Sequence, residues 1–421
     1  MSNHKKAQKT QKAQEGQKEL RATENPVTSK ESFVPLVPFV PLCGSMSHAE
    51  RELLSCCART NGPRERIQSI LSETQIDWDY FFLLARRHAV VPLVFRQLKD
   101  IVPPDKLQQF KKHSLENSAR NVVLAAELCR LIKLFADSGI EAIPYKGPIL
   151  SLFAYGDLSL RRFVDLDVIV KKADVARARD LLLADNYALA KPLTVEQQHL
   201  LLRTQHNLQF TKDNRQLIVE LHWEVAPHLF ASSVQTETLW QNLVAFELNG
   251  TTVKTLSADD LLFSLCVHGS RHLWERLGWI CDVAELISRH DLNWTTLLGR
   301  AAKADSERMF LLGLHLAETL LDAPLPSYVK HRCNADKRLA PLAFNIVANL
   351  FNGPEHVPAT PREIFKYNLG VRTSLSARAR YLVHMLQPTD SDVGRRSLPA
   401  GLHFAYYVMR PFRLMFKTGN Q

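Results

Sequence analysis

The spacing of apolar residues changes twice along the chain, and these two changes constrain the fold more than any other feature. From about residue 46 to 137 apolar residues recur at intervals of three and four, as in WDYFFLLARRHAVVPLVFRQL, which is typical of amphipathic helices. From 138 to 256 short strands and helices alternate, and from Ser257, a predicted helix N-cap, the helical spacing returns. We therefore predict an α+β protein in which a small mixed β-sheet with its own helices lies between N- and C-terminal helical regions.

The predicted core contains short strands and two hairpins. Strands are expected over 140–145 and 165–170, and on both sides of Asp213-Asn214 and of Asn249-Gly250, which are natural hairpin turns. Helices are expected over 147–155 and 173–186, where the apolar spacing is that of a helix. This mixture indicates a single α/β unit.

Residues 1–45 differ in composition from the rest of the chain. The first thirty are rich in Lys, Gln and Glu, and SFVPLVPFVPLCGS then carries three closely spaced prolines, which do not fit a helix interior. We expect a disordered basic tail and a Pro-rich linker here. The predicted organisation is therefore a tail and linker over 1–45, a helical N-terminal region over 46–137, the α/β core over 138–256 and a C-terminal helical region over 257–421.

The sequence indicates a reduced compartment. The N-terminus lacks the apolar core of a secretory signal, and no run of eighteen apolar residues predicts a membrane-spanning helix. The seven cysteines contain no C-x-x-C pair, which argues against a cysteine-rich zinc site. We expect a cytoplasmic protein.

Much of the positive charge lies in the tail. The formal net charge is +10, and the first thirty residues supply +4 of it, as seven Lys or Arg against three Glu. The rest of the chain is only mildly basic, which suits a phosphate-bearing ligand without selecting one. Binding of nucleic acid through the tail is not favoured, because no stacking aromatics lie among its lysines.

Two carboxylates stand at the start of an apolar strand in LRRFVDLDVIV. Asp165 and Asp167 are one residue apart, so on a strand both side chains point the same way. Neighbouring carboxylates stay ionised together only with cations between them, and this spacing suits a shared Mg²⁺. In QLIVELHWEV the same alternation puts Glu220 and His222 on one face, which makes a third carboxylate available. A D-x-D alone is common in surface loops, so the prediction depends on the residues around it.

Cationic groups surround this motif. In IPYKGPILSLFAYGD a strand ends at Lys146-Gly147 and runs straight into a helix, whose N-terminal amides can bind a phosphate. Lys146, Arg161 and Arg162 add positive charge for a polyphosphate, although any one of them is equally explained as part of a solvated turn.

Taken together, these elements resemble a known family. Lys146-Gly147, Arg161 with Asp165 and Asp167 four and six residues on, and Glu220-Leu221-His222-Trp223 are similar to the K-G…R-x-x-x-D-x-D…[DE]-L-H-W pattern of a bacterial branch of the DNA polymerase β nucleotidyltransferase superfamily. His268-Gly269 with RLGWICDVAEL, and the C-terminal LPAGLHFAYYVMRPFRLM, extend the resemblance over most of 120–417. The chain differs from the superfamily's usual Gly-Gly or Gly-Ser motif, because Pro148 follows Gly147 and the gap to the D-x-D is longer.

The resemblance implies a reaction and a role for each residue. It implies a Mg²⁺-dependent transfer of a nucleoside monophosphate from an NTP to a hydroxyl acceptor, which is a small molecule, a sugar or a protein, with two metal ions that Mn²⁺ can replace. The catalytic and metal-binding residues implied are Asp165, Asp167 and Glu220. The nucleotide- and substrate-binding residues implied are Lys146, Gly147, Arg161, Arg162, His222 and His268.

Other interpretations remain open for several of these features. His222 is equally explained as a structural histidine beside Trp223. His268 and His272 have the i, i+4 spacing of a zinc site, but no third ligand follows, so packing or substrate contact is favoured. The aromatic and basic stretch LHFAYYVMRPFRLMFK is interpreted as a final helix that packs on the core, rather than as a membrane or partner contact. The alternative function is a non-catalytic nucleotide-binding or scaffolding module of the same fold, in polysaccharide biosynthesis or a toxin-antitoxin-like system.

Overall fold

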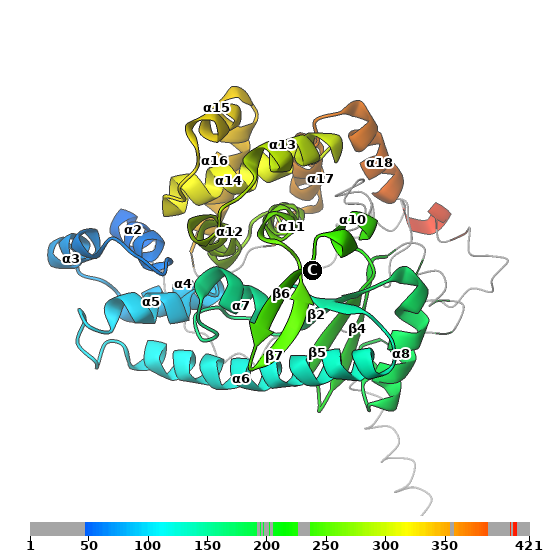
Figure 1. Ribbon diagram of the computed structural model, residues 1–421. Helices are drawn as coiled ribbons and strands as arrows, with labels where there is room; N and C mark the ends of the chain where they lie inside the picture. The colour runs from blue at the N-terminus through cyan, green and yellow to red at the C-terminus, as the bar shows by residue number, and fades with distance from the viewer. Residues whose placement is uncertain are drawn as a thin grey trace, which may run out of the picture.

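The computed structural model describes most of the chain after the predicted tail (Figure 1). It describes residues 47–191, 205–225, 236–353 and 358–385, together with 194, 197, 202, 405 and 407–410. The predicted tail and linker over 1–45 lie outside the described residues, as does most of the C-terminal stretch LHFAYYVMRPFRLMFK. The fold is of the α+β class, as predicted, with a small mixed sheet and helical flanks.

A five-stranded sheet of order β1-β2-β5-β4-β3 lies at the centre. Its strands are β1 (Ala142–Pro144), β2 (Leu166–Val170), β3 (Ala188–Leu189), β4 (Asn207–Lys212) and β5 (Leu217–His222). β2 runs parallel to β5, and the other neighbouring pairs are antiparallel. A separate hairpin consists of β6 (Val244–Leu248) and β7 (Thr251–Thr255). Asp213-Asn214 lies between β4 and β5, and Asn249-Gly250 lies between β6 and β7, so the chain reverses at both predicted turns.

The helices before and within the core do not all lie on the same face of the sheet. They are α2 (His48–Cys57), α3 (Arg64–Glu73), α4 (Trp78–Arg87), α5 (Val91–Leu98), α6 (Gln108–Asp137), α7 (Pro148–Tyr155), η1 (Lys172–Asp174) and α8 (Val175–Ala184). Figure 1 shows the long helix α6 running alongside the sheet. Its buried residues Leu124, Leu128 and Phe135 belong to one apolar cluster with Val168 and Val219 of β2 and β5. Burial of these side chains holds α6 against the sheet.

The opposite face of the sheet meets the C-terminal helices. These are α10 (Thr236–Gln241), α11 (Ala258–Arg271), α12 (Leu277–Arg289), α13 (Trp294–Lys303), α14 (Glu307–Leu321), α15 (Ser327–Ala335), α16 (Leu339–Leu350), α17 (Pro361–Gly370) and α18 (Leu375–Met385). Ile169 of β2 packs in a second apolar cluster with residues of α5, α11 and α12. All five residues of β2 are buried because both faces of the sheet are covered, and Asp167 is the charged one.

The turn between α11 and α12 is fixed by a buried tryptophan. Trp274 is fully buried and has a positive φ of 55°. Its ring lies so close to Gly269 that a Cβ there would come within 2.3 Å of it, and a Cβ at Gly313 within 3.0 Å. Larger residues at these two glycines would therefore displace the ring, and with it the ends of α11 and α12.

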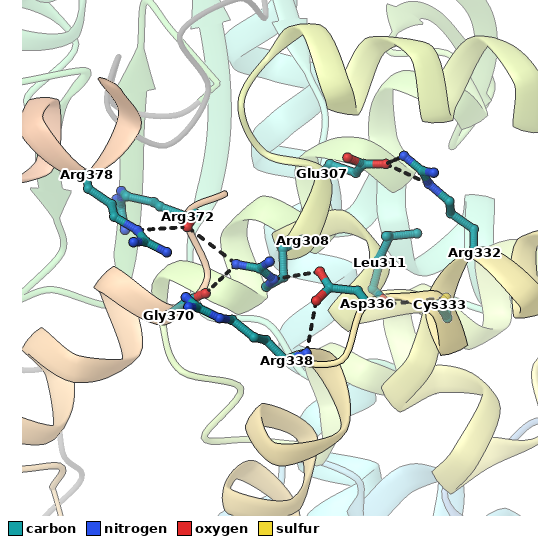
Figure 2. Close-up of polar contacts among 10 residues, drawn as sticks. All are labelled: Glu307, Arg308, Leu311, Arg332, Cys333, Asp336, Arg338, Gly370, Arg372 and Arg378. Atoms are coloured by element: carbon teal, nitrogen blue, oxygen red, sulfur yellow. Dashed lines mark hydrogen bonds and ion pairs between the residues drawn. The ribbon is translucent and has the colours of Figure 1, made fainter. Parts of the chain in front are cut away.

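Ion pairs connect the last helices to one another (Figure 2). Arg308 of α14 donates to the Asp336 carboxylate at 2.6 Å and to the Gly370 carbonyl at 2.8 Å. Asp336 also accepts from the backbone N–H of Arg338 at 3.0 Å. A single buried guanidinium thus links α14, the turn before α16 and the end of α17. In the described part of the chain no helix combines the length and apolarity that crossing a bilayer requires.

Candidate active site

Two parallel strands place the predicted acidic residues on one face of the sheet. The register of β2 and β5 pairs Asp167 with Glu220 and Ile169 with His222. Because side chains alternate along a strand, Asp167, Glu220 and His222 point to the same side, toward the C-terminal helices. Asp165 lies one residue before β2 and is partly buried. The register puts Asp167 and Glu220 on one face, as the alternation in the sequence predicts, and Asp165 lies outside it.

Lys146 and His222 hold the central carboxylate. The Lys146 Nζ atom lies 3.1 Å from Asp167 Oδ1. His222 Nε2 lies 3.2 Å from the same oxygen and 3.3 Å from Glu220 Oε2. The side chains of Asp167 and His222 are 4% and 3% exposed, whereas that of Glu220 is 24% exposed. Both contacts to Asp167 are made to Oδ1, so Oδ2 stays available for another ligand.

The carboxylates have different pKa values because their partners differ. Burial and the neighbouring charges of Asp167 and Glu220 raise the pKa of Asp165 to about 7. Burial also opposes ionisation of Asp167, but the Lys146 ammonium and His222 overcome it and lower its pKa. The pKa of His222 is raised, because its bonds to Asp167 and Glu220 outweigh its burial. Asp165 is therefore the carboxylate of this group that forms no ion pair among the described residues.

These residues are able to hold a metal ion. Ligand atoms of Asp167, Glu220 and His222 lie within 4.8 Å of one another. Among the described residues no hydrogen bond or ion pair reaches the Asp165 carboxylate, and only the more distant charges of Lys146 and Arg161 favour its ionised form. Carboxylate oxygens are typical ligands of hard divalent cations. The donor set differs from the predicted one in that His222 is nearer than Asp165 to the other two ligands.

Gly147 turns the chain from β1 into α7 beside this group. Its φ of 52° and ψ of −125° suit glycine, and a Cβ would lie 3.1 Å from the backbone oxygen of Asp165. Pro148, the first residue of α7, has no N–H, and the N–H of Ile149 bonds the Lys146 carbonyl at 3.1 Å. This helix therefore offers few free amides to a phosphate.

Helix α11 brings further basic side chains near the carboxylates. Arg271 Nη1 lies 3.0 Å from His206 Nε2, and because arginine only donates, His206 accepts with this nitrogen. Burial lowers the pKa of Arg271, while the nearby Glu220 opposes that change. The rings of His268 and His272 are tilted, with centroids 4.6 Å apart; burial lowers the pKa of His268 well below its ordinary value and that of His272 to about 3. The two histidines are therefore neutral, and no acidic residue joins them as a zinc ligand in the described residues.

The two predicted arginines lie in different surroundings. Arg161 forms a bidentate ion pair with Asp282 of α12, with Nε–Oδ1 and Nη2–Oδ2 distances of 2.8 and 3.0 Å. The Tyr155 hydroxyl donates to the same carboxylate at 2.7 Å. Arg162 is half-buried and lines a small cavity beside this pair.

Three residues of the site were not identified as site residues from the sequence. His206, Arg271 and Asp282 lie outside the D-x-D and E-L-H-W motifs, and for Asp282, in GWICDVAEL, the sequence leaves open whether it faces the same site or only forms a salt bridge. In the sequence, Asp282 is indicated only by being a charged residue within the apolar helix α12. Their partners lie 65 and 121 residues away, which no local pattern indicates.

Comparison with protein families gives a match that covers the whole site. A family model described as an uncharacterised nucleotidyltransferase matches residues 74–322, more than half of the chain and all of the site residues named above. A similar solved structure is that of an antigenic nucleotidyltransferase-like protein from Paracoccidioides brasiliensis, at 14% identity and a TM-score of 0.30, covering 50% of this chain and 96% of that one. None of the curated proteins compared with the chain matches it.

Proposed function

The chain belongs to the uncharacterised nucleotidyltransferase family and is thus a transferase of phosphorus-containing groups, and we propose that it moves a nucleoside monophosphate from an NTP to a hydroxyl acceptor in a Mg²⁺-dependent reaction. The acceptor oxygen bonds to the α-phosphorus, the bond from this phosphorus to the bridging oxygen breaks, and pyrophosphate leaves. The single observation that carries the proposal is the pairing of Asp167 with Glu220 on the neighbouring strands β2 and β5, with Asp165 one residue before β2.

Asp165, Asp167 and Glu220 are the residues proposed to hold the metal ions. Their oxygens suit Mg²⁺, while the His222 nitrogen in the same group suits Mn²⁺ better. Bound ions would neutralise charge on the transferring phosphate and activate the attacking hydroxyl. The raised pKa of Asp165 supports the proposal, because a metal ion is the cation that this carboxylate lacks.

Lys146 and His222 are proposed to set the position of the carboxylates. Lys146 and His222 both bond Oδ1 of Asp167, which fixes the side chain in one orientation and leaves Oδ2 to bind a metal ion. His222 also bonds Glu220, so it couples the positions of the two strands' carboxylates. Positioning of this kind is most of what a protein contributes to phosphoryl and nucleotidyl transfer.

Side-chain cations, rather than helix amides, are proposed to hold the polyphosphate. The superfamily's glycine motif is changed here to Gly147-Pro148, and α7 has few free N–H groups at its start. Lys146, Arg161, Arg162 and, from α11, Arg271 provide positive charge around the carboxylates. Guanidinium groups bind phosphate oxygens in pairs, which suits this task. His268, near Lys146 and Arg161, is proposed to contact the substrate.

A second candidate function is supported by one observation. Asp167 already has Lys146 and His222 as partners, so its charge is balanced without a metal ion. This charge balance is sufficient for a non-catalytic module, which binds nucleotides or serves as a scaffold in polysaccharide biosynthesis or a toxin-antitoxin-like system.

The transfer reaction is tested by following label from NTPs carrying ³²P at the α-phosphate. Purified protein is incubated with each NTP, Mg²⁺ or Mn²⁺, and a panel of hydroxyl acceptors that includes sugars, small molecules and proteins, and pyrophosphate release is measured in parallel. We expect release that requires the metal and is abolished in Asp167→Asn, but not in the control Asp180→Asn, whose carboxylate is 62% exposed on α8. Metal-dependent NTP binding without release in any acceptor mixture would instead favour the non-catalytic module.

A further inference from the structure

A small cavity lies beside the carboxylate site. It has a volume of about 40 Å³ and is enclosed by the turn between α4 and α5, the loop before β2 and the start of α12. Its polar and aromatic lining consists of Tyr155, Arg161, Arg162, Arg276, Trp279 and Asp282. Three guanidinium groups face one carboxylate, so the lining carries net positive charge.

Arg161 is held with one nitrogen directed away from its ion pair. Its Nε and Nη2 bond Asp282, which is 2% exposed and also receives the Tyr155 hydroxyl. Its Nη1 is buried and has no hydrogen-bond partner among the described residues. A buried N–H of a charged group without an acceptor is unfavourable, so the site favours a ligand that supplies an acceptor atom.

The loop that carries these arginines is fixed from α6. Asn121 Nδ2 donates to the carbonyls of Leu158 at 2.7 Å and of Arg161 at 2.8 Å, and Asn117 Nδ2 donates to the Ser159 carbonyl at 3.0 Å. Asn121 is fully buried and Asn117 nearly so. The loop is therefore already ordered before any ligand binds, which reduces the entropy lost on binding.

The size of the cavity limits the ligand. A single water needs roughly 10–15 Å³ of such volume, so the cavity holds the equivalent of about three or four waters. This is room for a tetrahedral oxyanion such as a phosphate group, and too little for a nucleobase. Arginine forks match phosphate oxygens in geometry as well as in charge.

The cavity adjoins the carboxylate site. Arg161, in its lining, is four residues before Asp165, the first of the carboxylates proposed to hold metal ions. A phosphate in the cavity would therefore belong to a molecule that reaches the reacting centre.

We propose that this cavity binds a phosphate group through Arg161, Arg162 and Arg276, and that Asp282 and Tyr155 are positioning residues that aim Arg161 into it. The phosphate is either the terminal part of the NTP or a phosphate carried by the acceptor. Its assignment to a substrate rests on the proposed function, whereas the affinity of the cavity for phosphate does not.

The test is calorimetric titration of inorganic phosphate and of pyrophosphate into the full chain and its variants. Arg276→Gln is the first variant, because Arg276 is half-buried at the start of α12 and its loss leaves the Arg161–Asp282 pair intact. We expect it to weaken phosphate binding about tenfold or more, since a charge-assisted contact is lost. The matched control is Arg66→Gln, which removes an exposed arginine paired with Glu52 on α3 and α2 and should leave phosphate binding unchanged.

Tyr155→Phe tests the positioning role. It removes only the bond to Asp282 and should weaken phosphate binding several-fold while circular dichroism stays that of the wild type. The proposal is overturned if neither anion binds, if Arg276→Gln binds phosphate as the wild type does, or if Arg66→Gln weakens binding equally.

Repeating the titration with bound nucleotide separates the two sources of phosphate. Phosphate that is excluded by a saturating NTP, but not by the corresponding monophosphate, assigns the cavity to the NTP's terminal phosphates. Phosphate that still binds beside the NTP assigns it to a phosphorylated acceptor. If no NTP binds and phosphate binding still depends on Arg276, the phosphate site stands and the proposed transfer reaction fails.

Discussion

Replacement of Lys146 by methionine tests how the carboxylates are balanced. The variant keeps a long aliphatic side chain but removes the ammonium that lies 3.1 Å from Asp167 Oδ1. The two side chains are only 13% and 4% exposed, so water does little to screen the charge that remains. We expect the free energy of unfolding to fall, because a buried carboxylate loses its main partner.

The magnitude follows from the burial of the pair. Removal of one member of a buried ion pair costs about 3–5 kcal/mol. Asp167 retains His222 at 3.2 Å, so we expect the lower end of this range, about 3 kcal/mol. In the folded wild type the pKa of Asp167 is lowered, so its ionised form stabilises the fold above the unfolded pKa of about 4, and this contribution is lost as the pH falls through the folded pKa. The difference between wild type and variant should therefore be largest near neutral pH and shrink in acid.

Urea unfolding followed by tryptophan fluorescence measures this effect. Trp223 is buried directly after His222 and reports on the core. The matched control is Lys133→Met, which breaks an i, i+4 pair with Asp137 whose lysine is 74% exposed, and which should cost less than about 0.5 kcal/mol. Equal losses in the two variants, or a Lys146→Met effect that does not change with pH, would refute the reasoning.

Three other substitutions test neighbouring features. Gly147→Ala should lower the free energy of unfolding in urea by about 2 kcal/mol. Gly250→Ala should lower it by less, because Gly250 also has a positive φ but an added Cβ would meet nothing there. Equal losses would exclude the contact with the Asp165 carbonyl as a cause. Asn121→Ala leaves two carbonyls of the loop before β2 without this donor and should cost about 2 kcal/mol; an unchanged urea midpoint would contradict this. Arg271→Gln should weaken NTP binding about tenfold in calorimetry, and unchanged affinity would remove Arg271 from the site.

The sheet and its acidic face were predictable because they depend on local periodicity. Alternation of period two in DLDVIV and QLIVELHWEV assigns Asp167, Glu220 and His222 to their faces before any pairing is known. The structure begins the strand at Leu166 rather than at Asp165, a difference of one residue at an element end. Parallel pairing of β2 with β5, which makes Asp167 and Glu220 neighbours, required the fold itself.

Contacts between distant helices were not predictable in this way. Arg161 was expected to hold phosphate, and two of its nitrogens bind Asp282 of α12, 121 residues away. The pattern around Asp282 shows only a charge within an apolar helix, and its partner depends on how α12 packs against the core. Likewise, Arg271 of α11 lies near Glu220 of β5, and this depends on how α11 packs against the sheet rather than on any local spacing.

Calorimetric titration of ATP, GTP, CTP and UTP, with and without Mg²⁺, tests the central claim most directly. The wild type is compared with Asp165→Asn/Asp167→Asn, which preserves side-chain shape while removing both charges at the start of β2. We predict that at least one NTP binds only with the metal, and that this binding is lost in the double variant. Binding of no nucleotide to the wild type, or equal binding to both proteins, would contradict the assignment of these carboxylates to a metal and nucleotide site.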